Sequence, residues 1–185
     1  MKNRILILVS LLCVSIIIIC CTIKIVEVNK RYPNTVVINV PYGEKTEYKN
    51  FELQIQDTKY IDYDELKSLN GNVSELYDKY EKYYNQTFAL IELQIKNCSD
   101  KAGNVELYQT VLGNNTSSNG VDVDLFEKFN DSSELLCPKL QPDESVRVVL
   151  TYSFLNQYFK NEKIDNMGLI VSLYPQKIFL ECEMY

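Results

Sequence analysis

An alternation of apolar and polar side chains marks the middle of the chain, over QTFALIELQIKN at residues 86–97. A period of two is typical of a β-strand that buries one face and exposes the other. The polar run that follows, up to residue 104, ends the pattern. The sequence therefore predicts a central strand, whose buried positions are Ala89, Ile91, Leu93 and Ile95.

Shorter β-branched, aromatic or alternating runs predict further strands along the chain. A Pro-led turn, LQPDES at residues 140–145, precedes one of them, and Pro175-Gln176 separates the last two as a hairpin. Seven or eight short strands at fairly regular spacing indicate an all-β fold, an immunoglobulin-like β-sandwich. The further predicted strands are 35–40, 48–57, 105–112, 121–129, 146–154, 168–174 and 177–184. Residues 121–129 also fit a short helix, and we favour the strand.

Residues 62–85 break the period-two pattern and predict a short helical insert. Ser74 is a suitable N-cap for a helix that runs to about Tyr84. Its tyrosines either pack on the edge of the sandwich or face a partner, since tyrosine is enriched at protein interfaces. The candidate partner surface comprises Tyr77, Tyr80, Tyr83 and Tyr84.

Residues 5–23 are apolar or uncharged and contain neither Pro nor Gly. As a helix they would measure about 28 Å, close to the thickness of a bilayer's hydrocarbon core. Lys2 and Arg4 precede the segment, which predicts a single-pass helix with the N-terminus inside and the remainder extracytoplasmic. The alternative is a cleaved signal peptide, whose apolar core is shorter and ends in small residues. The expected organisation is an anchor at 1–26, a stalk at 27–34 and a domain at 35–185.

Charge and residue content limit the classes of ligand and of catalytic site that we expect. Residues 27–185 carry 16 basic and 25 acidic residues, a net charge of −9, which argues against binding nucleic acid through general charge. The chain contains no histidine, so we expect no His-based catalysis and no zinc site. The sequence assigns no catalytic, cofactor-binding or metal residue. Three cysteines lie outside the apolar segment, at 98, 137 and 182, in a compartment that permits disulfides.

Paired acids are the remaining route to catalysis. Asp62, Asp64 and Glu65 form one group and Asp122 and Asp124 another. Two convergent carboxylates can hydrolyse a glycosidic bond, but acids near a helix or strand start are more often solvated surface. The same acidic pairs are not followed by the remaining residues of the D-x-D-x-D-G pattern of a calcium-binding loop.

Two motifs carry a resemblance to a known family. IELQIKN is an alternating strand that ends in Asn, and LQPDESVRVVLTYSF opens a strand with L-x-P-x-E-S and ends it in Phe. Over residues 48–184 the chain resembles the immunoglobulin-like, telokin-like extracytoplasmic domains of unknown function in Gram-positive lipoproteins and membrane-anchored proteins. Asp143 stands where that family usually has Gly. The resemblance implies a surface domain and supplies no catalytic residues. Its topology pairs the two motif strands antiparallel, which brings Cys98 toward Cys137 and predicts a disulfide between them.

The sequence thus predicts a non-catalytic extracytoplasmic domain, held at the cell membrane, that binds an envelope protein or another ligand. Two alternatives stay open: a carboxylate-dependent envelope hydrolase, and a structural or immunity-type membrane protein.

Overall fold

The computed structural model describes residues 2–33, 35–70, 73, 86–114, 117–130, 132–155 and 167–183, with the side chains of the first helix described from residue 13. The chain divides into two compact units, Met1–Val36 and Val37–Tyr185. Helix α1, Lys2–Arg31, makes up most of the first unit and extends into the residues predicted as a stalk. Within the part of the chain that the structure describes, no helix combines the length and hydropathy needed to cross a bilayer. The described structure therefore does not support the predicted transmembrane helix, which stays a prediction from residues 5–23.

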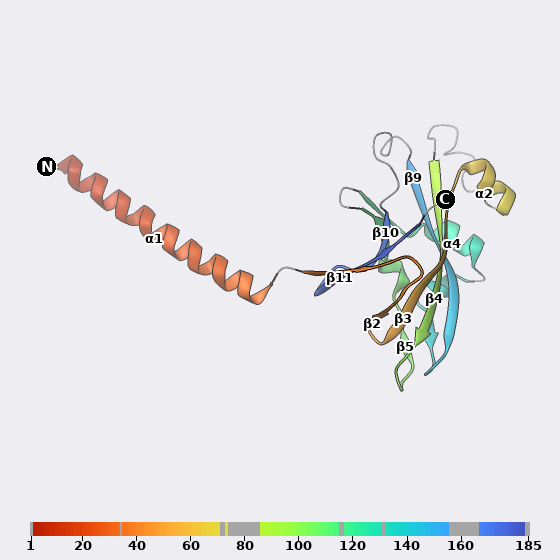
Figure 1. Cartoon of the computed structure of the whole chain (residues 1–185). Coiled ribbons are helices and arrows are strands. Elements are labelled where there is room, and N and C mark those ends of the chain that lie inside the picture. The colour runs from red at the N-terminus through yellow and green to blue at the C-terminus, as the bar shows by residue number, and fades with distance from the viewer. Residues whose placement is uncertain are drawn as a thin grey trace. The chain divides into compact units, whose positions relative to one another are not determined.

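The second unit is mostly β-structure, sandwich-like, with a few short helices (Figure 1). One sheet has the order β2-β3-β4-β9, a second has the order β1-β11-β10-β6-β7, and β5 pairs with β8 in a third. The strands are β1 Val36–Val40, β2 Lys45–Tyr48, β3 Phe51–Ile61, β4 Gln86–Asn97, β5 Gly103–Asn104, β6 Val111–Gly113, β7 Ser118–Gly120, β8 Lys139–Leu140, β9 Ser145–Leu155, β10 Gly168–Ser172 and β11 Gln176–Glu181. The helices are α2 Tyr63–Leu69, α4 Val123–Phe129 and the 3₁₀ turns η2 Leu107–Gln109 and η3 Ser133–Leu136.

Strand β4 confirms the predicted central strand, with the same bounds. It pairs antiparallel with β3 on one side and with β9 on the other. Its pairing with β9 runs unbroken from Gln86 opposite Leu155 to Lys96 opposite Ser145, as the two motif strands predicted. The four alternate apolar positions predicted to be buried are all inaccessible to solvent.

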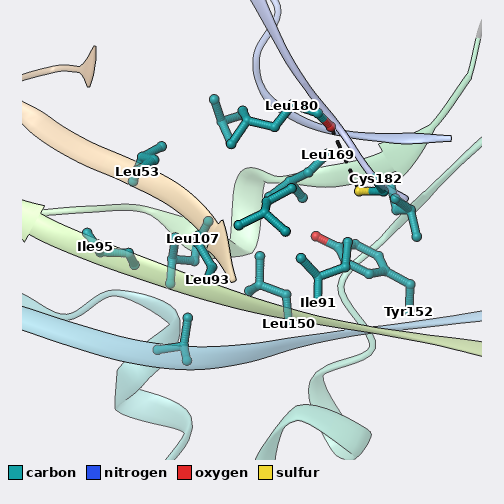
Figure 2. Packing of buried hydrophobic residues seen from close by; sticks show 14 of the residues in the cluster. Leu53, Ile91, Leu93, Ile95, Leu107, Leu150, Tyr152, Leu169, Leu180 and Cys182 are labelled. Carbon is teal, nitrogen blue, oxygen red and sulfur yellow. Dashed lines mark hydrogen bonds between the residues drawn. The ribbon is translucent and has the colours of Figure 1, made fainter. Parts of the chain in front are cut away.

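The main core lies where the apolar faces of the two large sheets meet (Figure 2). Strands β3, β4 and β9 contribute Leu53, Ile91 and Leu150, and β10 and β11 contribute Leu169 and Leu180 from the other sheet. The predicted C-terminal hairpin is confirmed, because β10 and β11 pair antiparallel.

A second apolar cluster explains why β4 is also buried on its other face near its start. Phe88 and Leu90 point away from the main core and are covered by Leu66 of α2 and Leu125 of α4. The two short helices therefore close this end of the four-stranded sheet.

Three sequence predictions are corrected. Within residues 121–129, where a strand was favoured over a short helix, Val123–Phe129 forms α4, because Asp122 caps a helix that buries Leu125 and Phe126. Residues 105–112, also predicted as a strand, form η2 and only the start of β6. The strand predicted at 48–57 is interrupted near its start by a two-residue hairpin turn, Lys49-Asn50, with φ angles of 50° and 68°. Each correction reflects a turn or cap that a period-two pattern does not register.

Candidate functional site

An open groove of 590 Å³ lies beside the beginning of β9. One wall comes from η3 and the segment that leads into β8, and the other comes from the first residues of β9 and the turn before them. The lining mixes apolar side chains with two acidic residues and one basic residue. It comprises Glu134, Leu135, Cys137, Pro138, Lys139, Leu140, Glu144, Ser145 and Val146.

The last residue of β4 holds one wall of this groove in place. The Asn97 side chain is buried, and its Nδ2 donates to the Leu140 carbonyl at 3.0 Å and to the Lys101 carbonyl at 2.8 Å. Its Oδ1 accepts from the Ser99 backbone N–H at 2.9 Å. A buried amide with its donors and acceptor all used fixes the segments that it joins. The Asn at the end of IELQIKN therefore positions β8 against the sheet.

The turn before β9 forms the other border of the groove. Asp143 has φ 62°, the left-handed region in which glycine is least strained, which explains why the resembled family usually has Gly here. The Glu144 carboxylate accepts from the Gln141 backbone N–H at 2.6 Å and closes the turn. Lys96 Nζ lies 3.1 Å from the Asp143 carboxylate, and this hydrogen bond raises the pKa of Lys96. The predicted Pro-led turn is thus present and tied to the end of β4.

The predicted site residues have different outcomes. Tyr77, Tyr80, Tyr83 and Tyr84 lie outside the described residues, so the tyrosine surface stays a prediction. Cys98 and Cys137 are both free thiols, so the structure does not contain the predicted disulfide between them. Cys137 lines the groove, whereas Cys98 is exposed and its backbone N–H donates to the Asn50 carbonyl at 2.9 Å.

The acidic groups considered for hydrolysis take part in helix capping. The Asp62 carboxylate accepts from the Glu65 backbone N–H at 2.9 Å and caps α2. The Asp122 carboxylate accepts from the Leu125 backbone N–H at 3.1 Å and caps α4. Among the described residues, no three acidic or cysteine side chains gather in a geometry that would hold a metal ion.

Sequence reasoning did not find the groove as a site. It registered the turn at 140–145 and Cys137 separately, but the wall made by η3 carried no periodic signal. The two walls come together only because β4 pairs with β9 and Asn97 binds the Leu140 carbonyl.

The model of a domain of unknown function, DUF5028, matches residues 35–178, which is most of the chain. The chain belongs to the DUF5028 family. Among curated proteins, none matches the sequence significantly.

Solved structures share the fold of this DUF5028 chain at low sequence identity. A functionally unknown protein from Listeria monocytogenes EGD-e has a TM-score of 0.52 and 13% identity, over 77% of this chain and 82% of its own. A conserved hypothetical protein from Bacillus anthracis has a TM-score of 0.47 and 11% identity, over 76% and 94%. An uncharacterized β-sandwich protein from Clostridium difficile 630 has a TM-score of 0.40 and 16% identity, over 80% and 95%. The first likeness supports the fold and no activity.

Proposed function

We propose that this DUF5028 chain is a non-catalytic binding domain, held at the outer face of the cell membrane, whose groove beside β9 takes a partner protein. The observation that carries the proposal is the groove itself, 590 Å³ in volume and lined by apolar side chains together with three charged residues. Binding sites of proteins combine an apolar floor with a few polar groups that fix orientation.

The walls of the groove are held by interactions within the domain. Asn97 fixes β8, and the Gln141–Glu144 hydrogen bonds close the turn before β9. A pre-formed site loses little conformational entropy on binding. Glu134, Lys139 and Glu144, which line the groove and are exposed, would supply charge-assisted contacts.

The membrane location rests on the sequence. Residues 5–23 are uncharged and are preceded by Lys2 and Arg4, the arrangement that places a single-pass helix with its N-terminus inside. The immunoglobulin-like, telokin-like type of the sandwich is part of the same proposal and is supported by the two motif strands, which pair as that topology requires.

Site-specific photocrosslinking of the full chain in its own cells tests the groove. A photoreactive amino acid at Glu134 or Lys139, both exposed on the groove wall, should give one discrete adduct with a second protein. The matched control is the same amino acid at exposed Lys59 on β3, which should give none. Equal adducts from all three positions, or none from the groove, would contradict the proposed binding surface.

Thiol labelling tests the location separately. Cys98 is exposed, so a membrane-impermeant maleimide should label it in intact cells. The Cys98→Ser chain supplies the background from the other cysteines. Labelling that requires cell lysis would place the domain inside the cell and refute the proposed location.

A further inference from the structure

We propose that the open edge of β9 at Ser145–Val148 binds a short extended peptide by β-strand addition. This inference rests on the proposed function, because it names the kind of partner segment that the groove takes. It follows from how the outer edge of β9 is covered along its length.

Strand β9 is an edge strand of the four-stranded sheet. The Asn97 N–H donates to the Glu144 carbonyl at 2.9 Å, and the register is unbroken from there along β9. In an antiparallel pair, the backbone groups of successive residues face alternately toward and away from the neighbouring strand. The even-numbered residues of β9 therefore bond to β4, and the odd-numbered residues from Ser145 onward face outward.

The second half of this outer edge is occupied by other parts of the chain. The side-chain amide of Asn130 takes the place of a neighbouring strand's backbone at Val149. Its Nδ2 donates to the Val149 carbonyl and its Oδ1 accepts from the Val149 N–H, both at 3.0 Å. The Thr151 carbonyl accepts from the Asp122 N–H at 2.8 Å. Asn119 Nδ2 donates to the Ser153 carbonyl.

The first half of the edge is different. Across the described ranges, the outward N–H and C=O groups of Ser145 and Arg147 have no hydrogen-bond partner within the protein. Both residues are exposed. An uncovered row of alternating donors and acceptors is the template that a β-strand completes.

The groove borders the start of this open stretch, at Ser145 and Val146, and supplies the side-chain contacts. Residues of an added strand alternate their side chains between the two faces of the sheet. Those on the core side would meet Val146 and the groove wall at Leu135 and Leu140. Those on the outer face would lie beside Arg147, which contacts Glu92 at 2.9 Å.

The length of the open edge limits what can bind. Asn130 blocks the strand at Val149, so only about four residues, or about 13 Å, are available. The occupant is therefore a short extended segment of a protein, with an apolar residue at alternate positions. Strand addition of this length gives about four backbone hydrogen bonds.

A displayed library of linear ten-residue peptides, selected on the full chain in detergent, tests the inference. The synthetic form of the selected peptide is then measured against Arg147→Pro, which deletes the outward N–H while leaving the bonds to β4 intact. The expected result is a Kd about tenfold weaker, in line with loss of one backbone hydrogen bond and a blocked edge. Arg147→Ala keeps the N–H and is the matched control, expected to stay within about threefold of the wild type.

Amide hydrogen exchange on the wild-type chain gives a readout independent of the proline variant. Addition of the selected peptide should slow exchange at the Ser145 and Arg147 amides. Unchanged exchange there, or equal affinity for both Arg147 variants, would overturn strand addition. If Leu135→Asp abolishes binding while Arg147→Pro does not, the partner uses the groove through side chains alone, and only the proposed function survives. A library that yields no binder would also overturn the peptide inference, whereas photocrosslinking would still decide the proposed function.

Discussion

The hydroxyl of Tyr152 lies 2.8 Å from the hydroxyl of Thr110 in the interior of the sandwich. Thr110 Oγ1 also donates to the Leu107 carbonyl at 2.7 Å, which uses its only proton. Tyr152 is therefore the donor in the pair and Thr110 the acceptor. Burial raises the pKa of Tyr152, and the bond joins β9 to the residue that follows η2.

This direction of donation predicts unequal costs for the two deletions. Thr110→Val leaves the fully buried Tyr152 hydroxyl without its acceptor, and we expect a loss of about 2–3 kcal/mol in the free energy of unfolding. The Leu107 carbonyl keeps the bond from the Thr110 backbone N–H at 2.9 Å. Tyr152→Phe leaves Thr110 donating to Leu107, so its expected cost is about 1 kcal/mol. Urea unfolding followed by near-UV circular dichroism measures both, because all 14 tyrosines lie after residue 31. Equal costs, or a double variant whose loss is the simple sum, would contradict the assignment.

The capping acids predict stability effects. Asp62→Ala and Asp122→Ala should each lower the free energy of unfolding by about 1 kcal/mol, because each exposes backbone N–H groups of a short helix. Asp64→Asn and Asp124→Asn, in the first turns of the same helices, are the controls and should change it by about 0.5 kcal/mol or less. Partner capture by the groove should be unaffected in all four variants. Larger losses from the first-turn variants than from the caps would refute the capping role.

Cys182 predicts a specific alkaline instability. Burial raises the pKa of its thiol to about 12 from 9.0, and Figure 2 shows it in the core beside Leu180. The folded state then keeps a proton that the unfolded state loses, so stability present below pH 9 falls as the pH rises from about 9 toward 12. The expected slope from this group is about 1.4 kcal/mol per pH unit.

Comparison with Cys182→Ala isolates that contribution from other groups that titrate in the same range. The difference in unfolding free energy between the two chains should be constant up to pH 8 and should shrink between pH 9 and 10. In the native state, a thiol reagent at pH 8 should modify exposed Cys98 and leave buried Cys182 intact. Rapid native-state reaction of Cys182 would contradict its burial.

The turn between β2 and β3 predicts a gain in stability. Lys49 and Asn50 both have positive φ, as in the two-residue hairpin turn whose second position favours glycine. Asn50→Gly should raise the free energy of unfolding by about 0.5 kcal/mol, and Asn50→Ala should lower it by about 1 kcal/mol. Thermal unfolding of the wild type and the two Asn50 variants measures the order of their stabilities. An Ala variant as stable as the wild type would show that the turn does not hold this conformation.

The strands that the sequence predicted well are those in which side-chain periodicity and burial agree. Along β4 and β9 the alternate residues face one continuous core, so local pattern and tertiary structure require the same conformation. The segment VDVDLFEKF at 121–129 fits a strand by its alternation, but it also places Leu125, Phe126 and Phe129 on a helical face. The helix forms because Asp122 caps it and because Leu125 then packs in the same apolar cluster as Leu90 of β4.

The groove could not be predicted for a different reason. Its walls, residues 134–140 and 144–146, are near neighbours in the chain, but no periodic pattern spans them to indicate that they face each other across a groove. The site exists because Asn97 binds Leu140 across the end of the sheet, a contact that depends on the register of three strands. Only features that are local in sequence were available beforehand, namely the LQPDES turn, Cys137 and the terminal Asn.

The partial covering of β9 by Asn130, Asp122 and Asn119 has a consequence for self-association. Long, flat strand edges let identical molecules join sheet to sheet without limit, the route by which β-proteins aggregate into fibres. Here the side chain of Asn130 ends the accessible edge after a few residues, too short a stretch for a second copy's eleven-residue β9 to dock along its length. The same amide that leaves room for one short strand thus limits how far the sheet can be extended along the β9 edge.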